Sequence, residues 1–503
     1  MQIEWQIGPP SDWQTDAIIF FVFEKSPEPL PGLKRWMAEE GIWLSRSAAL
    51  GDFKGKHQQT AVFYGPEDKR IARVVCVGLG QADKFDVEKL RSATAAALRE
   101  CRDLQLSRPA LPLSAFEGLQ IEIAPALEEA LIAGMLGLYR YEGLKTRDLE
   151  PSTFPETLLI LHDKEPDEAL RNVILDADAI ASGVSFARDL VAAPPNVSTP
   201  SFLAGAARRL ADRYGFRLDV LDLEKARAMG MGAFAAVAQG SREPAYFLVL
   251  EHAPPGTEQD HPLVLVGKGI TFDTGGISLK PGEKMDAMKH DMAGAGAVLG
   301  TFDVLGRMKI KRRVVGLMPC TENMPDGKAY KPADVIRSLS GLTIEVISTD
   351  AEGRMVLCDA LAYASRRYQP AMIVDIATLT GACVVALGRS VAAVMGNRDD
   401  LTQKVQEIGM RVGEKLWPLP LWDFYFENIK SDVADFKNVG ERAAGTIIGG
   451  IFLKQFVPEE IPWVHLDIAG TAWTDKDLGF APKGATGFGV RIFTEMVRRL
   501  PEL

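Results

Sequence analysis

The acidic residues Asp273, Asp291, Asp350 and Glu352 are the side chains of this 503-residue sequence best suited to chemistry. They lie in glycine-containing segments that read GKGITFDTGG, MKHDMAG and STDAEGR. If they converge they need positive charge nearby, because two like charges about 4 Å apart cost roughly 4 kcal/mol at an effective dielectric of 20. Two divalent cations would balance four carboxylates, and oxygen ligands suit Mg, Mn or Zn. The sequence therefore predicts a carboxylate-dominated, two-metal site.

Each of these acids also has a purely structural interpretation. Asp291 precedes the small-residue segment AGAGAVLG and could cap a helix there. Asp350 and Glu352 could serve a turn and a helix start. Taken singly, the two interpretations are equally credible. Taken together, acids that follow successive predicted strands favour a functional site.

The elements that must position these acids are strands. From Pro262 onward, apolar runs alternate with helical patterns, which predicts a mostly parallel sheet covered by helices on both faces. In such sheets, ligands bind outside the carboxyl ends of the strands. We therefore expect the segments after these strands to meet at one edge. The runs are LVLVG at 263, VVGLMP at 314, IEVIS at 344, MIVDIA at 372 and WVHLDIAG at 463.

The whole chain is predicted to be an α/β protein of two domains. Residues 1–165 combine short strands with helical patterns and form a smaller α/β domain. A helix over 166–192 links it to the rest and ends at the prolines of AAPPNVSTP, since proline cannot continue a helix. Residues 193–503 form the larger catalytic domain with the central sheet.

Composition limits the classes of function. Lys and Arg total 57 against 67 Asp and Glu, so the net charge of −10 disfavours a general nucleic-acid binder. The basic cluster RMKIKRR at 307–313 leaves a local contact open. No signal or transit peptide is recognisable, and the most apolar stretch, 376–388, is too short to span a membrane. Five widely spaced cysteines fit reduced thiols in a core. We expect a cytoplasmic protein that makes no membrane contact.

Four segments together resemble the leucyl aminopeptidase family of two-metal exopeptidases: GKGITFDTGGISLKP from Gly267, MKHDMAG from Met288, ENMPDG from Glu322 and STDAEGRM from Ser348. The resemblance continues through DIATLTGA, HLDIAGTAW and KGATGFGVR, and so covers most of residues 186–491. Ser348 and Met355 depart from the family's usual Asn and Leu. The resemblance makes the N-terminal domain similar to macro domains and implies a homohexamer.

The resemblance also implies a role for each site residue. Asp273 and Glu352 would bridge two metal ions. Asp350 would complete the ligands of one ion, and Lys268 and Asp291 would complete those of the other. Lys280 would stabilise the oxyanion of the substrate carbonyl. Arg354 would hold a bicarbonate ion that acts as general base. The pocket for the first side chain would be lined by Met288, Leu379, Gly381, Ala469 and Ala472.

The activity implied is hydrolysis of the N-terminal residue, leucine or another apolar amino acid, from peptides. Metal binding lowers the pKa of water from about 15.7 to about 7, so a hydroxide that bridges the two metals would be the nucleophile. The metals would be Mn or Zn, with Mg a further option. A two-metal phosphatase, dipeptidase or amidase is the enzymatic alternative, and a DNA-binding or regulatory role is the non-enzymatic one.

Overall fold

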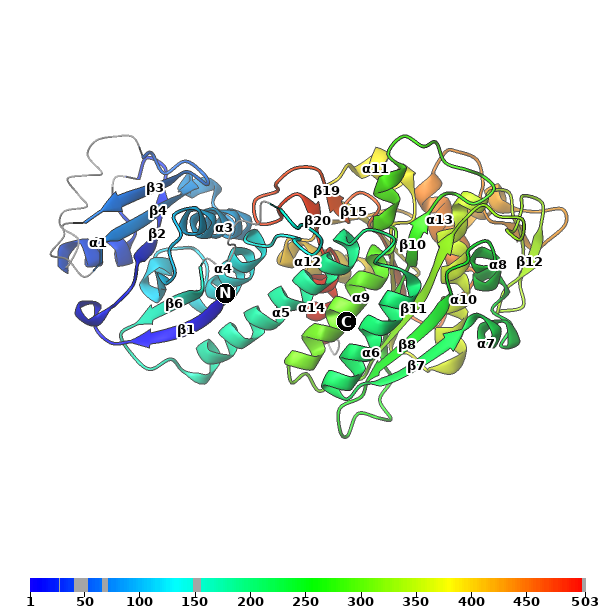
Figure 1. The fold of residues 1–503 in the computed structure, drawn as a ribbon, viewed down its shortest axis with the longest axis horizontal. Helices are drawn as coiled ribbons and strands as arrows, with labels where there is room; N and C mark the ends of the chain where they lie inside the picture. Colours follow the sequence, from blue (N-terminus) through cyan, green and yellow to red (C-terminus); the bar gives the residue numbers. More distant parts are fainter. Residues whose placement is uncertain (27, 40–52, 66–70, 148–154, 500–503) are drawn as a thin grey trace. The chain divides into compact units, whose positions relative to one another are not determined.

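The computed structural model describes residues 1–26, 28–39, 53–65, 71–147 and 155–499. The chain divides into two compact units (Figure 1). The first comprises Met1–Ala181 and Lys476–Lys483, and the second comprises Ser182–Asp475 and Gly484–Leu503. Both units combine β-sheet with helices, so the predicted two-domain α/β architecture is confirmed.

The described part of the first unit contains a six-stranded sheet in the order β1-β6-β5-β2-β4-β3. All its pairings are parallel except that of β3 with β4. The strands are β1 (Gln2–Ile7), β2 (Ala17–Phe23), β3 (Thr60–Tyr64), β4 (Arg73–Gly80), β5 (Pro109–Pro112) and β6 (Thr157–His162). Its helices are α1 (Pro31–Glu39), α3 (Val87–Asp103) and α4 (Ile123–Gly137).

The long helix predicted before the prolines is α5 (Glu168–Ala192). The division between the two units falls within it, between Ala181 and Ser182. The next helix, α6 (Pro200–Tyr214), has proline at its first position, where no backbone N–H is needed. Thr199 caps it, since its hydroxyl accepts from the Phe202 N–H at 3.2 Å. Local sequence therefore accounts for this helix boundary.

The second unit is organised around a sheet in which nine strands are described. Their order is β16-β15-β18-β14-β9-β11-β8-β7, and β10 also pairs with β11. The central pairings, from β18 through β14 and β9 to β11, are parallel, which confirms the predicted mostly parallel sheet. The strands are β7 (Arg217–Asp222), β8 (Tyr246–His252), β9 (Leu263–Gly267), β10 (Gly269–Asp273), β11 (Val314–Asn323), β14 (Met372–Ala377), β15 (Ala392–Gly396), β16 (Leu416–Pro418) and β18 (Trp463–Asp467).

Helices cover both faces of this sheet (Figure 1). One layer contains α6, α9 (Ala293–Arg307), α12 (Asp399–Val412) and α14 (Val490–Arg499). The other contains α8 (Gly232–Ala238), α10 (Glu352–Arg367) and α13 (Gly445–Lys454). Every residue of β9 and β14 is buried, as expected for strands covered on both sides. The smaller helices are α7 (Leu223–Ala228) and α11 (Gly381–Leu387), and the last strand pair is β19 (Trp473–Thr474) with β20 (Gly484–Ala485).

The apolar run at 344 was expected to be a strand of the central sheet, and this is wrong. Only Thr343–Glu345 form a strand there, β13, which pairs with β12 (Val335–Arg337) and β17 (Phe436–Lys437) in a separate sheet. The chain then turns away, because the Asn438 side chain accepts the N–H groups of Ile347 and Ser348. Asp350 and Glu352 therefore reach the site from a turn rather than from a central strand.

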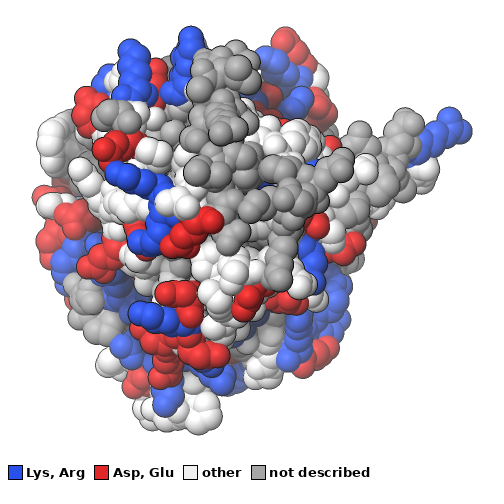
Figure 2. All heavy atoms as spheres, turned by 90° about the vertical axis from the view of Figure 1, so that its left-hand side faces the viewer, with Lys and Arg blue, Asp and Glu red and all other residues white. Residues whose placement is uncertain are grey.

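The cysteines are in the state that the sequence predicts. All five cysteines are free and buried, as predicted. Within the described part of the chain, no helix combines the length and apolarity that a membrane crossing requires. On the face drawn in Figure 2, basic and acidic side chains are interspersed. In the RMKIKRR cluster, Arg307 pairs with Asp303 and Arg313 pairs with Glu251, so two of its charges are already compensated.

Candidate metal centre

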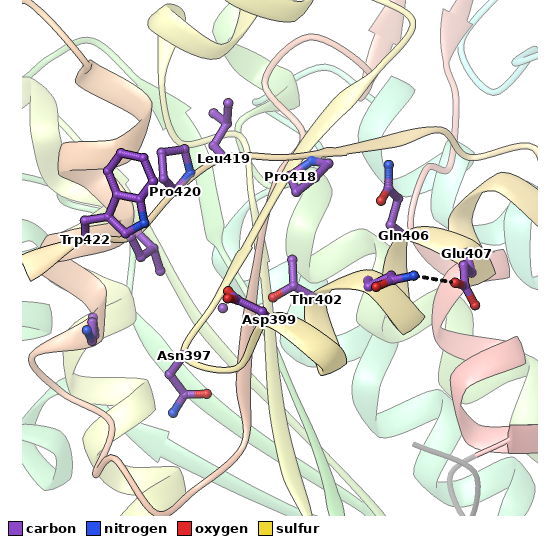
Figure 3. Close-up of a pocket in the computed structure, with 13 residues that line it drawn as sticks. Asn397, Asp399, Thr402, Gln406, Glu407, Pro418, Leu419, Pro420 and Trp422 are labelled. Carbon is purple, nitrogen blue, oxygen red and sulfur yellow. Dashed lines mark hydrogen bonds between the residues drawn. The ribbon is translucent and has the colours of Figure 1, made fainter.

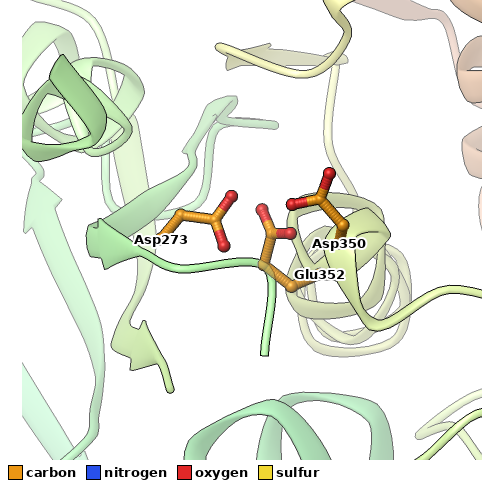
Figure 4. Close-up of side chains that lie close together, drawn as sticks. All are labelled: Asp273, Asp350 and Glu352. Carbon is orange, nitrogen blue, oxygen red and sulfur yellow. The ribbon is translucent and has the colours of Figure 1, made fainter. Parts of the chain in front are cut away.

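Three of the predicted metal ligands meet beside the central sheet. Asp273 is the last residue of β10, Asp350 lies in the 3-10 turn Thr349–Ala351, and Glu352 begins α10. One carboxylate oxygen from each lies within 4.8 Å of the others, and the three side chains point toward one another (Figure 4). Asp273 and Glu352 are buried, whereas Asp350 is exposed. The group is therefore partly buried, with Asp350 on its exposed side.

Lys268 joins Asp291 to this group. Its ammonium nitrogen lies 2.9 Å from Asp291 Oδ1 and 2.8 Å from Glu352 Oε1, and it donates to the Thr378 carbonyl at 3.0 Å. Asp291 was alternatively interpreted as a helix cap, and this is wrong. Helix α9 begins after Met292 without a side-chain cap, while Asp291 Oδ1 accepts from the Thr378 hydroxyl at 2.7 Å.

Lys280 completes the network from the loop after β10. Its ammonium group lies 2.7 Å from Asp273 Oδ2 and also donates to Asp350 Oδ1. All five predicted ligands and Lys280 are therefore linked by direct ion pairs or by proximity of their carboxylates. Side chains that are up to 84 residues apart in the chain, from Lys268 to Glu352, belong to one cluster.

Two glycines beside the acidic residues are required by this packing. A Cβ on Gly353 would lie 2.6 Å from Lys268 Nζ, so only glycine leaves room for the buried lysine. Gly275 has φ +86°, which disfavours other residues, and its N–H donates to Asp273 Oδ1 at 2.8 Å. The glycines beside the acids thus determine how closely the charged groups approach.

The cluster has an excess of negative charge. Four carboxylates face two ammonium groups, so 4 − 2 leaves two charges uncompensated when all are ionised. Burial is the largest influence on Asp291, Glu352 and Asp350 and raises the pKa of each, although the lysines oppose it. Asp291 Oδ2 is buried without a hydrogen-bond partner. A buried, oxygen-rich and under-compensated cluster fits divalent cations.

Lys268 can act as a ligand only as a neutral amine. Burial is the largest influence on its pKa and lowers it, but the combined charges of Asp291, Glu352 and Asp273 outweigh burial and raise the pKa. Divalent cations would neutralise those three carboxylates, after which burial would favour the neutral amine. Beside the ionised carboxylates, Lys268 is therefore a cation. With divalent cations on those carboxylates, Lys268 could be a neutral amine and so a metal ligand.

Arg354 lies next to the cluster rather than in it. It is buried, its Nη1 donates to the Asn438 carbonyl at 2.8 Å, and its Nε has no hydrogen-bond partner. Burial lowers its pKa to about 10, while the charges of Glu352 and Asp467 act in the opposite direction. Arg354 therefore remains a cation at neutral pH and has a donor left for an anion.

The five predicted pocket residues lie on three segments of the second unit. Leu379 and Gly381 follow β14, and the N–H groups of Leu379 and Ala469 both donate to Asp467 Oδ1, each at 3.1 Å. Gly381 is exposed and a Cβ added there would meet open space, whereas Ala472 is buried. Met288 lies in the 3-10 helix Met285–His290.

A ring contact connects two of these segments. His290, at the end of the Met288 segment, stacks on Trp473, which follows Ala472, with ring centroids 6.0 Å apart. The Lys289 ammonium lies 5.1 Å from the centre of the same Trp473 ring. The segment that carries Met288 and Asp291 is thus packed against the segment that carries Ala472.

Sequence reasoning did not assign roles to three further residues of the site. Asn323, at the end of β11, donates to Asp273 Oδ1 at 2.8 Å, to the Thr349 carbonyl at 3.0 Å and to Glu352 Oε2 at 3.5 Å. Thr378 contacts both Lys268 and Asp291, and Asp467 holds the loop at Leu379. Their position in the sequence could have identified them, because each is a polar residue at or just after the carboxyl end of an apolar strand.

A groove of about 610 Å³ lies elsewhere on the second unit, between the first turns of α12 and the segment that begins at Pro418 (Figure 3). It is bordered by Asn397 and Asp399, by Pro418–Trp422 and by Lys454. It shares no residue with the carboxylate cluster. Among the described residues, the only group of three or more acidic, His or Cys side chains close enough to hold a metal is Asp273, Asp350 and Glu352.

The α/β sheet and the carboxylate–lysine cluster at its edge define a metal-dependent hydrolase. The model of the cytosol aminopeptidase family, catalytic domain, matches residues 185–494, and the model of the N-terminal domain of that family matches residues 19–148. The chain belongs to the cytosol aminopeptidase family.

Whole-chain relatives agree with this assignment. A probable cytosol aminopeptidase of Syntrophobacter fumaroxidans is 61% identical over 100% of this chain and 99% of the relative. One of Nitratidesulfovibrio vulgaris is 47% identical over 99% of each. The resemblance predicted from the sequence is therefore confirmed.

Solved structures with the same fold include enzymes. The bottromycin maturation enzyme BotP in complex with Mn has a TM-score of 0.85 and 34% identity, over 97% of this chain and 99% of BotP. A mutant of tomato leucine aminopeptidase has a TM-score of 0.88 and 34% identity, over 99% and 96%. The protein is a metal-dependent aminopeptidase that acts on peptides, and divalent metal ions are its cofactors. This favours the aminopeptidase over the other two-metal hydrolases considered above.

Proposed function

We propose that the protein releases N-terminal leucine and other apolar residues from peptides, using two divalent ions per subunit held by the cluster around Lys268. The observation that carries this proposal is the linkage of Asp273, Asp291, Asp350 and Glu352 through two lysines in one partly buried cluster. Divalent cations account for four carboxylates held together where solvation is poor, because the two lysines leave part of their charge uncompensated.

The proposed ligands divide into two sets that share Asp273 and Glu352. Asp350 completes one set, and Lys268 with Asp291 completes the other. Mn or Zn is the proposed metal, with Mg as a further option, because the set is rich in oxygen and contains one amine. When bound, such ions lower the pKa of water towards neutrality and so supply a nucleophile for amide hydrolysis.

Lys280 would act on the carbonyl group of the substrate, and Arg354 would act through a general base that takes a proton from water. The charges of Asp273, Glu352 and Asp350 outweigh the effect of burial and raise the pKa of Lys280, so it is an ammonium group at neutral pH. Such a donor, held beside the cluster, would stabilise the negative charge that develops on the carbonyl oxygen. Arg354 would hold bicarbonate, a general base that accepts a proton from water. The unpartnered Nε of Arg354 supports this role.

The pocket formed by Met288, Leu379, Gly381, Ala469 and Ala472 would receive the first side chain. Its small residues Gly381, Ala469 and Ala472 would leave space for an apolar group such as that of leucine. We further propose that the enzyme works in the cytoplasm, as the name of its family suggests, and that it assembles as a homohexamer.

A metal-replacement assay tests the proposal. The enzyme is stripped with a chelator, and hydrolysis of leucine p-nitroanilide and of an N-acetylated leucine analogue is then followed while Mn or Zn is added back. We expect activity to disappear on chelation, to return with about two ions per subunit, and to require the free amino group. Turnover that survives exhaustive chelation, or equal turnover of the acetylated substrate, would show that the proposed function is wrong.

A further inference from the structure

Asp467, the last residue of β18, is fully buried yet accepts four hydrogen bonds. Its Oδ1 accepts the backbone N–H groups of Leu379 at 3.1 Å, Thr380 at 3.4 Å and Ala469 at 3.1 Å. Its Oδ2 accepts the Thr380 hydroxyl at 2.6 Å. These donors replace the water that the carboxylate loses on burial.

The donors belong to two different loops. One segment runs from β14 into the start of α11 and carries Leu379 and Gly381, while the other follows β18 and carries Ala469 and Ala472. Strands β14 and β18 are parallel neighbours with Ala377 opposite Asp467, so both loops leave the sheet at the same edge. Four of the five proposed pocket residues therefore lie on loops that a single side chain holds together.

The hydrogen bonds to Asp467 connect these two loops through a charged side chain. The Thr380 hydroxyl also lies 2.9 Å from that of Thr446, which connects the first loop to the start of α13. Two further bonds join the same segments, from the Ile468 N–H to the Ala377 carbonyl at 2.8 Å and from the Cys383 thiol to the Asp467 carbonyl at 3.4 Å. A charged acceptor forms stronger and shorter hydrogen bonds than a neutral one, so its loss would loosen the two loops beyond these backbone contacts. The metal-binding carboxylates do not contact Asp467 through any hydrogen bond in the described residues.

We propose that Asp467 is a positioning residue that determines the width of the side-chain pocket and hence the preference for the first residue of the substrate. This inference rests on the proposed function, because it concerns selectivity among aminoacyl substrates. Asp467 acts through Leu379, Thr380 and Ala469 and does not touch the reacting atoms.

The test compares Asp467→Asn with a matched control, Asp359→Asn. Asp359 is also a fully buried carboxylate of the second unit, and it accepts the N–H groups of Phe234 at 2.9 Å and Leu339 at 2.7 Å, two segments outside the pocket. For each variant, kcat and KM are measured with the alanine, leucine and phenylalanine p-nitroanilides. The affinity for Mn is measured by calorimetry, and the midpoint of thermal unfolding is recorded.

We expect Asp467→Asn to lower kcat/KM for the leucine substrate by about 10- to 100-fold, as sub-ångström to 1 Å misplacement does. The ratio of kcat/KM for leucine to that for alanine should fall by about tenfold, while Mn affinity stays within about twofold. Asp359→Asn should change the unfolding midpoint but leave this ratio at the wild-type value.

A smaller perturbation covers the case in which Asp467→Asn does not fold. Thr380→Val removes the bond to Oδ2 together with the contacts of the same hydroxyl with Thr446 and the Cys383 N–H, and should lower the leucine-to-alanine ratio, whereas Thr380→Ser, which keeps the hydroxyl, should retain the wild-type ratio. A wild-type ratio in Asp467→Asn or in Thr380→Val, or equal loss of selectivity in Asp359→Asn, would overturn the proposal. An inactive wild-type enzyme would instead refute the proposed function.

Discussion

Removing the Asn323 amide should weaken metal binding without removing any proposed ligand. Its Nδ2 lies 2.8 Å from Asp273 Oδ1 and 3.5 Å from Glu352 Oε2, the two carboxylates proposed to be shared by both metals. The same group donates to the Thr349 carbonyl at 3.0 Å and so holds the turn that carries Asp350. Asn323→Ala therefore loosens three of the five proposed ligands at once.

The size of the effect follows from these contacts. A hydrogen bond to a charged group contributes about 1.5 to 3 kcal/mol, and the 3.5 Å contact adds little at that distance. Outer groups that orient ligands typically change metal affinity about 10- to 100-fold, which corresponds to about 1.4 to 2.8 kcal/mol. The two estimates agree, so we expect Mn to bind at least about tenfold more weakly to Asn323→Ala.

The assay is calorimetric titration of the metal-free protein with Mn, together with the chelator concentration that halves activity. The matched control is Asn397→Ala. Asn397 also ties two segments of the second unit, since it donates to the Ile461 carbonyl at 2.8 Å and accepts the Trp463 N–H at 2.9 Å, but it contacts none of the acids. Wild-type Mn affinity in a folded Asn323→Ala, or the same loss in Asn397→Ala, would refute the reasoning.

Two further predictions concern charge. Lys280→Ala should lower kcat on leucine p-nitroanilide about 100-fold or more with a smaller change in KM, because its ammonium group would act mainly in the transition state; near-normal kcat would exclude that role. Burial raises the pKa of Asp359 to about 7, although the backbone N–H groups of Leu339, Phe234 and Ala233 oppose this. The stability linked to Asp359 is therefore fully present below its unfolded pKa of about 3.9 and is lost as pH rises through about 7. The free energy of unfolding in urea should fall as the pH rises from about 4 to about 7, and Asp359→Asn should flatten this dependence; an unchanged slope would contradict it.

Much of the catalytic unit could be predicted because its strands are continuous apolar runs. The runs at 263, 314, 372 and 463 all became central strands, since sequences that are apolar on both faces are stable only between two helix layers. The run at 344 misled the prediction because Ile344, Val346 and Ile347 give it the local appearance of a buried strand. What ends it is a long-range contact with Asn438, which no local pattern reveals.

By itself the sequence determined which groups could do chemistry. Acids and lysines beside glycines at strand ends are identifiable locally, and so is their need for positive charge. The family resemblance could likewise be found from short segments, and whole-chain comparison agrees with it.

Only the tertiary structure decided how these groups meet. Lys268 approaches Asp291 and Glu352 because Gly353 leaves space for it, and Asn323 and Asp467 acquire their roles from partners that are 50 or 88 residues away. Hydrogen bonds and ion pairs of this kind depend on ångström-scale distances between distant segments. Those distances arise from the packing of the sheet and its helices, and no local periodicity encodes them.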